Sequence, residues 1–179
     1  MKNFFKSLLS LLLISAFTFS SNSLFAQSNS DGGNNSEKRT YKKARVLTSK
    51  TAKKVVKVVE ALERQKVVKV PDPENEGKFI EKEEDDPDWN EAKRILTELL
   101  NERADLKSYD RSVMWNYWGY IYFSEEDYDQ AMYSYEQLLK EPEATIPLRT
   151  SSLLTLAQLN LVKANWEKGS RRILQWMDE

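Results

Sequence analysis

The amino-acid sequence predicts an all-α protein, a short α-solenoid of about three packed helix pairs. The first observation is an internal repeat, because DWNEAKRILTELL, DYDQAMYSYEQLL and NWEKGSRRILQWM align without gaps. Their starts lie 39 and 38 residues apart, which leaves room for a second helix in each unit. The second observation is that apolar residues recur at helical spacing in each segment. A composition with 40% apolar residues is sufficient for a packed core.

The three aligned segments place apolar or small residues on one helix face. Four aligned positions, or repeat columns, carry this pattern, the aromatic residue near the start of each segment and the positions three, seven and ten residues after it. They are Trp89, Tyr128 and Trp166; Ala92, Ala131 and Gly169; Leu96, Tyr135 and Ile173; Leu99, Leu138 and Trp176. Each segment begins with an acid or an amide, immediately before the aromatic residue, which predicts a side-chain N-cap at Asp88, Asp127 and Asn165. A Glu or Gln three residues later predicts a full capping box at the first two of them.

A second helix is predicted before each aligned segment. Before the second and third segments, matching positions carry Trp115, Trp118, Gly119 and Tyr122, and then Leu153, Leu156, Ala157 and Asn160. The small residues in these positions and in the second column should let the two helices of a pair approach closely. Before the first segment, a helically spaced stripe predicts an amphipathic helix from Thr48 to about Gln65; it consists of Ala52, Val55, Val59, Leu62 and Lys66, and Val56 and Val58 widen it.

Charge separates into two blocks between the first two predicted helices. Residues 37–69 hold twelve Lys and Arg against three Glu, and residues 72–88 hold nine acids against two Lys. We expect a short extended piece at 66–70, and an irregular, mobile acidic loop at 71–88 because it contains three prolines and a glycine. The acids lack EF-hand spacing, so a solvated charge run is favoured over a calcium site. The two blocks can pair with each other or with a partner.

The first 26 residues have the features of a secretory signal. Lys2 and Lys6 precede an uncharged apolar run, and Leu24-Phe25-Ala26 predicts cleavage after Ala26. This run is about 12 residues long, whereas a membrane-spanning helix needs about 20, so no stable membrane insertion is expected after cleavage. Residues 27–40 predict a disordered leader, because they contain few large apolar side chains. A periplasmic protein of a Gram-negative bacterium is expected.

Composition argues against most catalytic chemistry. The chain has no cysteine and no histidine, which removes thiol nucleophiles, disulfides and the commonest metal ligands. We therefore expect no enzyme, no cofactor and no metal, and a net charge of -1 gives no reason to expect a nucleic-acid partner. A hydrolase using Glu125, Glu126 and Asp127 is the minor alternative, although helix capping already explains Asp127.

The best repeat runs from Trp115-Asn-Tyr-Trp118-Gly119-Tyr-Ile-Tyr122 to Asp127, Ala131, Tyr135 and Pro142. This pattern resembles the tetratricopeptide repeat family, whose motif is W-x₂-L-G-x₂-Y followed by A, an aromatic residue and P. The resemblance covers about residues 41–177. It implies a first pair at 41–104 that contains the acidic loop 71–88, a second pair at 108–141 and a third pair at 148–177.

A narrower resemblance points to a function. The run Ser108-Tyr109-Asp110-Arg111, together with Thr155-Leu156-Ala157-Gln158-Leu159, resembles the small periplasmic tetratricopeptide proteins of TonB energy-transduction systems. That resemblance implies a protein-binding adaptor that works beside TonB, ExbB and ExbD in transport across the outer membrane. The alternative is a scaffold in another envelope assembly, such as pilus, secretion or motor machinery.

In tetratricopeptide arrays the first helix of each pair lines a concave groove. The resemblance therefore implies a partner-binding surface of Val113, Asn116, Tyr117, Tyr120, Phe123, Leu154, Gln158 and Leu161. Trp115, Trp118 and Tyr128 are expected in the core, while Tyr120 and Phe123 suit core and groove equally. Trp176 and Met177 are expected to be exposed, so the last pair should pack on a second copy or on a partner.

Overall fold

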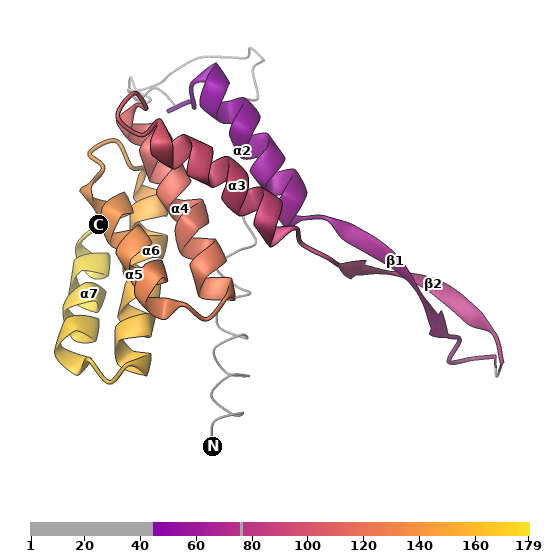
Figure 1. The fold of residues 1–179 in the computed structure, drawn as a ribbon. Helices are drawn as coiled ribbons and strands as arrows, with labels where there is room; N and C mark the ends of the chain where they lie inside the picture. Colours follow the sequence, from indigo (N-terminus) through magenta and orange to yellow (C-terminus); the bar gives the residue numbers. More distant parts are fainter. Residues whose placement is uncertain (1–44, 76) are drawn as a thin grey trace, which may run out of the picture. The chain divides into compact units, whose positions relative to one another are not determined.

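The computed structural model describes residues 45–75 and 77–179. The predicted signal peptide (1–26) and leader (27–40) lie outside the described residues. Six helices and one two-stranded hairpin make up this part of the chain (Figure 1). None of these six helices combines the length and the apolar character needed to span a bilayer.

The helices follow one another in three packed pairs, which confirms a mostly helical fold built of helix pairs. The first pair is formed by α2 and α3, the second by α4 and α5, and the third by α6 and α7. In chain order the elements are α2 (Ser49–Leu62), β1 (Gln65–Pro71), β2 (Phe79–Asp85), α3 (Trp89–Asn101), α4 (Ser108–Ser124), α5 (Tyr128–Lys140), α6 (Ile146–Val162) and α7 (Trp166–Asp178).

The same backbone hydrogen bond closes the turn inside each pair. The Asp127 N–H donates to the Tyr122 carbonyl at 2.9 Å, and the Asn165 N–H donates to the Asn160 carbonyl at 2.8 Å. In the first pair the Asp88 N–H makes the equivalent bond to the Ala61 carbonyl at 2.8 Å. The donor and acceptor are five residues apart in the later pairs and 27 apart in the first. An insertion of 22 residues therefore occupies the first turn without opening the pair.

The insertion is a β-hairpin, so the prediction of an irregular loop at 71–88 was wrong. Strands β1 and β2 pair antiparallel from Gln65 opposite Asp85 to Pro71 opposite Phe79. The predicted extended piece at 66–70 is confirmed as part of β1. Opposite charges face each other across the hairpin, because Lys69 lies opposite Glu81. Figure 1 shows the hairpin extending from the adjacent ends of α2 and α3.

The predicted helix caps are confirmed in part. Asp88 accepts a hydrogen bond from the Glu91 N–H at 3.0 Å, and Asp127 accepts one from the Gln130 N–H at 3.2 Å. Asn165 makes no side-chain cap, so that prediction was wrong. The full capping boxes were also wrong, because the backbone N–H of each cap residue already donates to the preceding helix.

The core confirms the repeat columns in the first two pairs. Leu96, Leu99 and Leu138 are fully buried, and Tyr135 is 6% exposed. Burial raises the pKa of the Tyr135 phenol above its ordinary value, and a smaller contribution comes from Tyr120, so the ring stays neutral. In α7 only the column of small residues holds, because Gly169 is buried whereas Trp166, Ile173 and Trp176 of the other columns are exposed.

Two first helices differ from the pattern that the sequence suggested. In α2 the buried residues are Thr51, Val55, Val58 and Ala61. Val55 and Val58 of the predicted stripe are therefore confirmed in the core, whereas Ala52, Val59 and Leu62 are half-buried. In α4 the fully buried apolar side chains are Met114 and Ile121, while Trp115 and Tyr122 are half-buried. Tyr128 is half-buried too, whereas Trp118 is in the core as expected.

Small residues bring the helices of a pair together, as predicted. A Cβ atom at Gly119 would lie 2.7 Å from the ring of Tyr135 on α5. A Cβ atom at Gly169 would lie 2.7 Å from Cδ2 of Leu161 on α6. Both distances are shorter than a carbon–carbon contact allows, so neither position has room for a side chain without a shift.

A buried carboxylate joins α2 to α4. Asp110 is 1% exposed, and its oxygens accept bonds from the Thr48 N–H at 3.1 Å, the Thr48 hydroxyl at 2.6 Å and the Thr51 hydroxyl at 3.0 Å. Thr48 is the N-cap residue of α2 and makes no side-chain cap of its own; the carboxylate from α4 accepts its backbone N–H beside the positive end of the α2 dipole. Desolvation of this charge is offset because each partner is a donor.

The neighbouring arginine ties α4 to the turn after α5. Arg111 forms a bidentate ion pair with Glu141, with two N–O distances of 2.7 Å, and donates to the Leu106 carbonyl at 2.6 Å. Glu141 holds the pKa of Arg111 above its ordinary value through these hydrogen bonds. Asp110 and Arg111 of the Ser-Tyr-Asp-Arg run therefore hold helices together.

Candidate protein-binding surface

The predicted partner-binding residues come from α4 and α6, which are in contact along the chain of pairs. All eight side chains are half-buried, neither withdrawn into the core nor fully open to solvent. Five are on α4 (Val113, Asn116, Tyr117, Tyr120 and Phe123) and three are on α6 (Leu154, Gln158 and Leu161).

The aromatic members of this set also pack between helices. The Tyr120 ring lies 6.1 Å from the Trp89 ring of α3, and the Phe123 ring lies 5.8 Å from the Tyr128 ring of α5. Tyr117 packs against the core cluster that includes Leu96, Met114 and Ile121, and burial raises the pKa of its phenol. These three rings therefore contribute to the contacts between helices as well as to the surface.

Leu161 has a structural contact as well, because its side chain packs on Gly169 of α7. Four predicted residues remain without such an assignment: Val113, Asn116, Leu154 and Gln158. Within the described ranges, neither amide of this group makes a side-chain hydrogen bond. An amide that is half-buried beside apolar side chains can bond the backbone of an extended peptide, since it offers both a donor and an acceptor.

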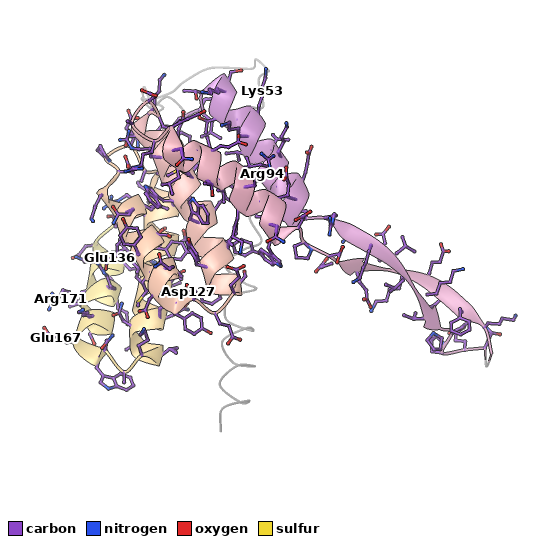
Figure 2. The ribbon with its side chains drawn as sticks, in the orientation of Figure 1. Lys53, Arg94, Asp127, Glu136, Glu167 and Arg171 are labelled. Carbon is purple, nitrogen blue, oxygen red and sulfur yellow. The ribbon has the colours of Figure 1, made fainter. Side chains whose placement is uncertain are left out.

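The basic face of α2 pairs with acids of α3, which belong neither to the acidic block at 72–88 nor to a partner. The ammonium group of Lys54 lies 3.2 Å from Glu98 and 3.4 Å from Glu102, and that of Lys50 lies 3.0 Å from Glu102. These hydrogen bonds hold the pKa of Glu102 below its ordinary value. Lys53 stays exposed on α2 (Figure 2).

The acidic block pairs with the base of its own hairpin. Arg64 contacts Asp86 at 2.8 Å and Asp88 at 3.1 Å, and Lys66 contacts Asp86 at 3.5 Å. The Arg64 hydrogen bond is the main reason why the pKa of Asp86 lies below its ordinary value. Such exposed ion pairs contribute little to stability and weaken with salt.

A cleft between α3, α4 and α5 was missed by sequence reasoning. Its volume is about 470 Å³ and its walls combine aromatic rings with polar side chains: Leu100, Arg103, Trp115, Trp118, Tyr122, Gln130, Tyr133, Ser134 and Gln137. The Trp118 and Tyr122 rings stack at 5.2 Å, and the Trp115 and Tyr133 rings meet edge to face at 6.0 Å.

The indole N–H of Trp118 is buried and has no hydrogen-bond acceptor among the described residues. Pattern reasoning assigned the α4 aromatics to the core, because a helical stripe does not distinguish a core from the wall of a cleft. The signal that was available is the number of large rings on one helix, Trp115, Trp118 and Tyr122, because side chains of this size are rarely all fully buried.

The three carboxylates considered for hydrolysis have separate local roles. Glu125 forms an ion pair with Lys93 of α3, and Asp127 caps α5. Glu126 adopts the left-handed conformation, with φ of 63°, in the turn between α4 and α5. Among the described residues, no group of three or more acids is arranged to hold a metal ion.

Comparison of the chain with known protein families, with curated proteins and with solved structures gives no match. What the chain does therefore has to follow from its own residues and their geometry.

Proposed function

We propose that this chain is a periplasmic protein-binding adaptor of the tetratricopeptide type, an accessory component of a TonB–ExbB–ExbD energy-transduction system. One observation carries the proposal: tandem helix pairs place α4 and α6 in contact, and their surface combines apolar side chains with amides that lack hydrogen bonds among the described residues. Fold alone does not specify a partner, so the TonB assignment rests on the sequence resemblance.

The chemistry of the surface favours a polypeptide as the ligand. Val113 and Leu154 provide apolar area, which accounts for affinity in protein interfaces. Asn116 and Gln158 provide backbone-directed hydrogen bonds without charge. A surface of this kind suits a peptide segment better than an anionic ligand, because none of the four side chains is basic.

Site-specific photo-crosslinking tests this proposal. A photoreactive amino acid placed at Asn116 or at Gln158 of the exported protein should capture TonB, ExbB or ExbD in native envelopes. The matched control is the same probe at Thr97, an exposed residue of α3, which should capture none of them. Circular dichroism of each labelled protein shows whether the helices are intact.

The outcomes separate the adaptor proposal from its alternatives. Capture of pilus, secretion or motor components would replace the TonB assignment with the scaffold alternative. Capture from Tyr133, but not from Asn116 or Gln158, would move the binding surface to the aromatic cleft. Equal capture at Thr97 and Asn116 would contradict a specific surface on α4 and α6.

A pair of variants measures the contribution of the amides. Asn116→Ala combined with Gln158→Ala should weaken partner binding about 10-fold or more, since each amide contributes about 1 kcal/mol through hydrogen bonds. These variants are preferable to Tyr120→Ala, because that ring also packs on Trp89. Thr97→Ala is the control and should leave binding unchanged.

A further inference from the structure

Helix α7 exposes more large apolar side chains than a stable free surface normally carries. Its exposed fractions are 66% for Trp166, 37% for Ile173, 62% for Leu174, 42% for Trp176 and 69% for Met177. Trp166, Ile173, Leu174 and Met177 are spaced at offsets of zero, seven, eight and eleven, which places them on one helix face. A contiguous apolar face of this kind marks an interaction site.

The internal repeat indicates that this face is built to be covered. Ile173 occupies the column of Leu96 and Tyr135, and Trp176 occupies that of Leu99 and Leu138. In α3 and α5 these positions are 0–6% exposed. Leu96 and Leu99 share a core cluster with residues of the next helix, α4, and Tyr135 shares one with residues of α6. No described element packs on the equivalent face of α7.

Charge along α7 indicates what covers it. Residues 166–172 carry Lys168, Arg171 and Arg172 against Glu167, while residues 173–179 carry only acids, Asp178 in the last turn and Glu179 at the C-cap. This order opposes the helix macrodipole, which favours acids near the N-terminus and bases near the C-terminus. The arrangement becomes favourable beside an antiparallel copy of the same helix, where each basic half faces an acidic half.

Arg172 and Glu179 have partners on other helices of the chain, and Arg171 forms an exposed ion pair with Glu167 at 2.6 Å within α7. Arg172 pairs with Glu136 of α5, and Glu179 pairs with Arg149 of α6. Arg171 in the first half and Asp178 in the last turn border the exposed apolar face on the same side. Figure 2 shows Arg171 and Glu167 projecting from α7 away from α6.

Helix α2 of another copy does not suit this face. Its exposed positions include Lys53 and Lys57, and Val56 is its one large apolar side chain with more than a third of its surface exposed. Packing α2 on α7 would bury these lysines against Lys168 or Arg171, which costs desolvation without an opposite charge.

We propose that α7 packs antiparallel against α7 of a second copy of this chain, forming a twofold-symmetric dimer. Leu174 and Ile173 lie near the twofold axis, and Ser170 of each protomer faces Met177 of the other. Isologous contact of this type closes after two copies, so Ile173, Leu174 and Met177 are removed from solvent without producing a filament. This proposal is independent of the partner-binding surface on α4 and α6.

Sedimentation of the purified exported protein tests the dimer. The protein should sediment as a dimer at micromolar concentration, and Leu174→Glu with Met177→Glu should raise the dissociation constant at least about 100-fold. Both side chains are more than 60% exposed in the single chain, so the helices should be retained. The control Val56→Glu should leave the dimer unchanged. A wild-type monomer, or a dimer that persists in the double variant, would overturn the proposal.

Cysteine crosslinking tests the orientation, and the absence of native cysteine makes each single substitution unambiguous. In the antiparallel dimer Leu174→Cys should form a disulfide between the two copies under mild oxidation. Trp166→Cys should not, because the two positions are separated by about 20 Å along the helix axis and a disulfide requires Cα atoms about 5–6 Å apart. Efficient crosslinking at Trp166 with none at Leu174 would indicate parallel helices and contradict the proposal.

Discussion

Helices α3 and α7 align column by column in sequence and differ in burial. Leu96 and Leu99 of α3 are fully buried, whereas Ile173 and Trp176 in the same columns of α7 are 37% and 42% exposed. Both helices pack on the first helix of their own pair. The difference is that α4 follows and covers α3, while no described element covers α7. In tandem helix pairs, the residues of a repeat column are therefore buried in the core only where the next helix of the array packs on them.

The largest expected difference between these helices is in stability. Leu99→Ala should lower the free energy of unfolding by about 3–5 kcal/mol, because it leaves a cavity in a closed core. Trp176→Ala should lower it by about 1 kcal/mol in the monomeric Leu174→Glu, Met177→Glu background, because Trp176 is already 42% exposed and its truncation leaves no closed cavity. Urea unfolding followed by circular dichroism measures both. Equal losses at the two positions would contradict the comparison.

Polar contacts between helix pairs should also contribute more to the free energy of unfolding where they are buried than where they are exposed. Asp110→Ala should lower the free energy of unfolding by about 2–3 kcal/mol, because it leaves buried donors of Thr48 and Thr51 without an acceptor. Asp129→Ala is the matched control: it removes an ion pair to Lys163, but the Asp129 side chain is 73% exposed. Its effect should be below about 1 kcal/mol in the same urea titration.

Substitution by alanine at the two close-packed glycines, Gly119 and Gly169, should also destabilise the protein to different extents. Gly119→Ala should destabilise by about 1–3 kcal/mol, because the new methyl group meets the buried ring of Tyr135. Gly169→Ala meets the half-buried Leu161 of the uncovered last pair, where α7 has room to shift, so its effect should be smaller. Thermal unfolding at matched concentration ranks the two. A larger loss at Gly169 would show that α7 is held as tightly as α5.

Removing the hairpin should have a small effect on the helices. Replacing residues 65–85 with a short turn like those of the later pairs should change the free energy of unfolding by about 1 kcal/mol or less, because an isolated two-stranded hairpin is marginally stable. Nearly all of the hairpin side chains are exposed, and the bond from Asp88 to Ala61 closes the pair beneath it. Loss of helical circular dichroism in this variant would assign the hairpin a role in folding.

The smallest effect on stability is expected from removal of the ion pair between Glu179 and Arg149. Hydrogen bonds from Arg149 hold the pKa of Glu179 below its ordinary value of 4.5. A depressed carboxyl pKa means that the stabilisation is present above pH 4.5 and is lost as the pH falls through the folded-state pKa. Glu179→Gln should thus lower the melting temperature slightly at about pH 7 and have no effect near about pH 2. An equal effect at both pH values would exclude this ion pair as the cause.

Much of the helical framework followed from local sequence. The repeat starts at Asp88 and Asp127 predicted helix boundaries, because an N-cap side chain bonds the backbone within three residues. The close approach at Gly119 was also predictable, since the lack of a side chain is a property of the residue itself. The hairpin was missed because prolines and acids usually mark a loop, and its cross-strand pairs join residues up to 20 apart in sequence.

For the candidate site, the sequence identified the helices but not the environment of each ring. It determined the mostly helical class and the packed helix pairs, because these depend on periodicity along one chain segment. Tertiary structure alone decided that Asp110 accepts hydrogen bonds at the start of α2 and that Trp118 and Tyr122 line a cleft. It also decided that no described element packs on the apolar face of α7. Those outcomes depend on contacts between segments distant in sequence, which no local pattern encodes.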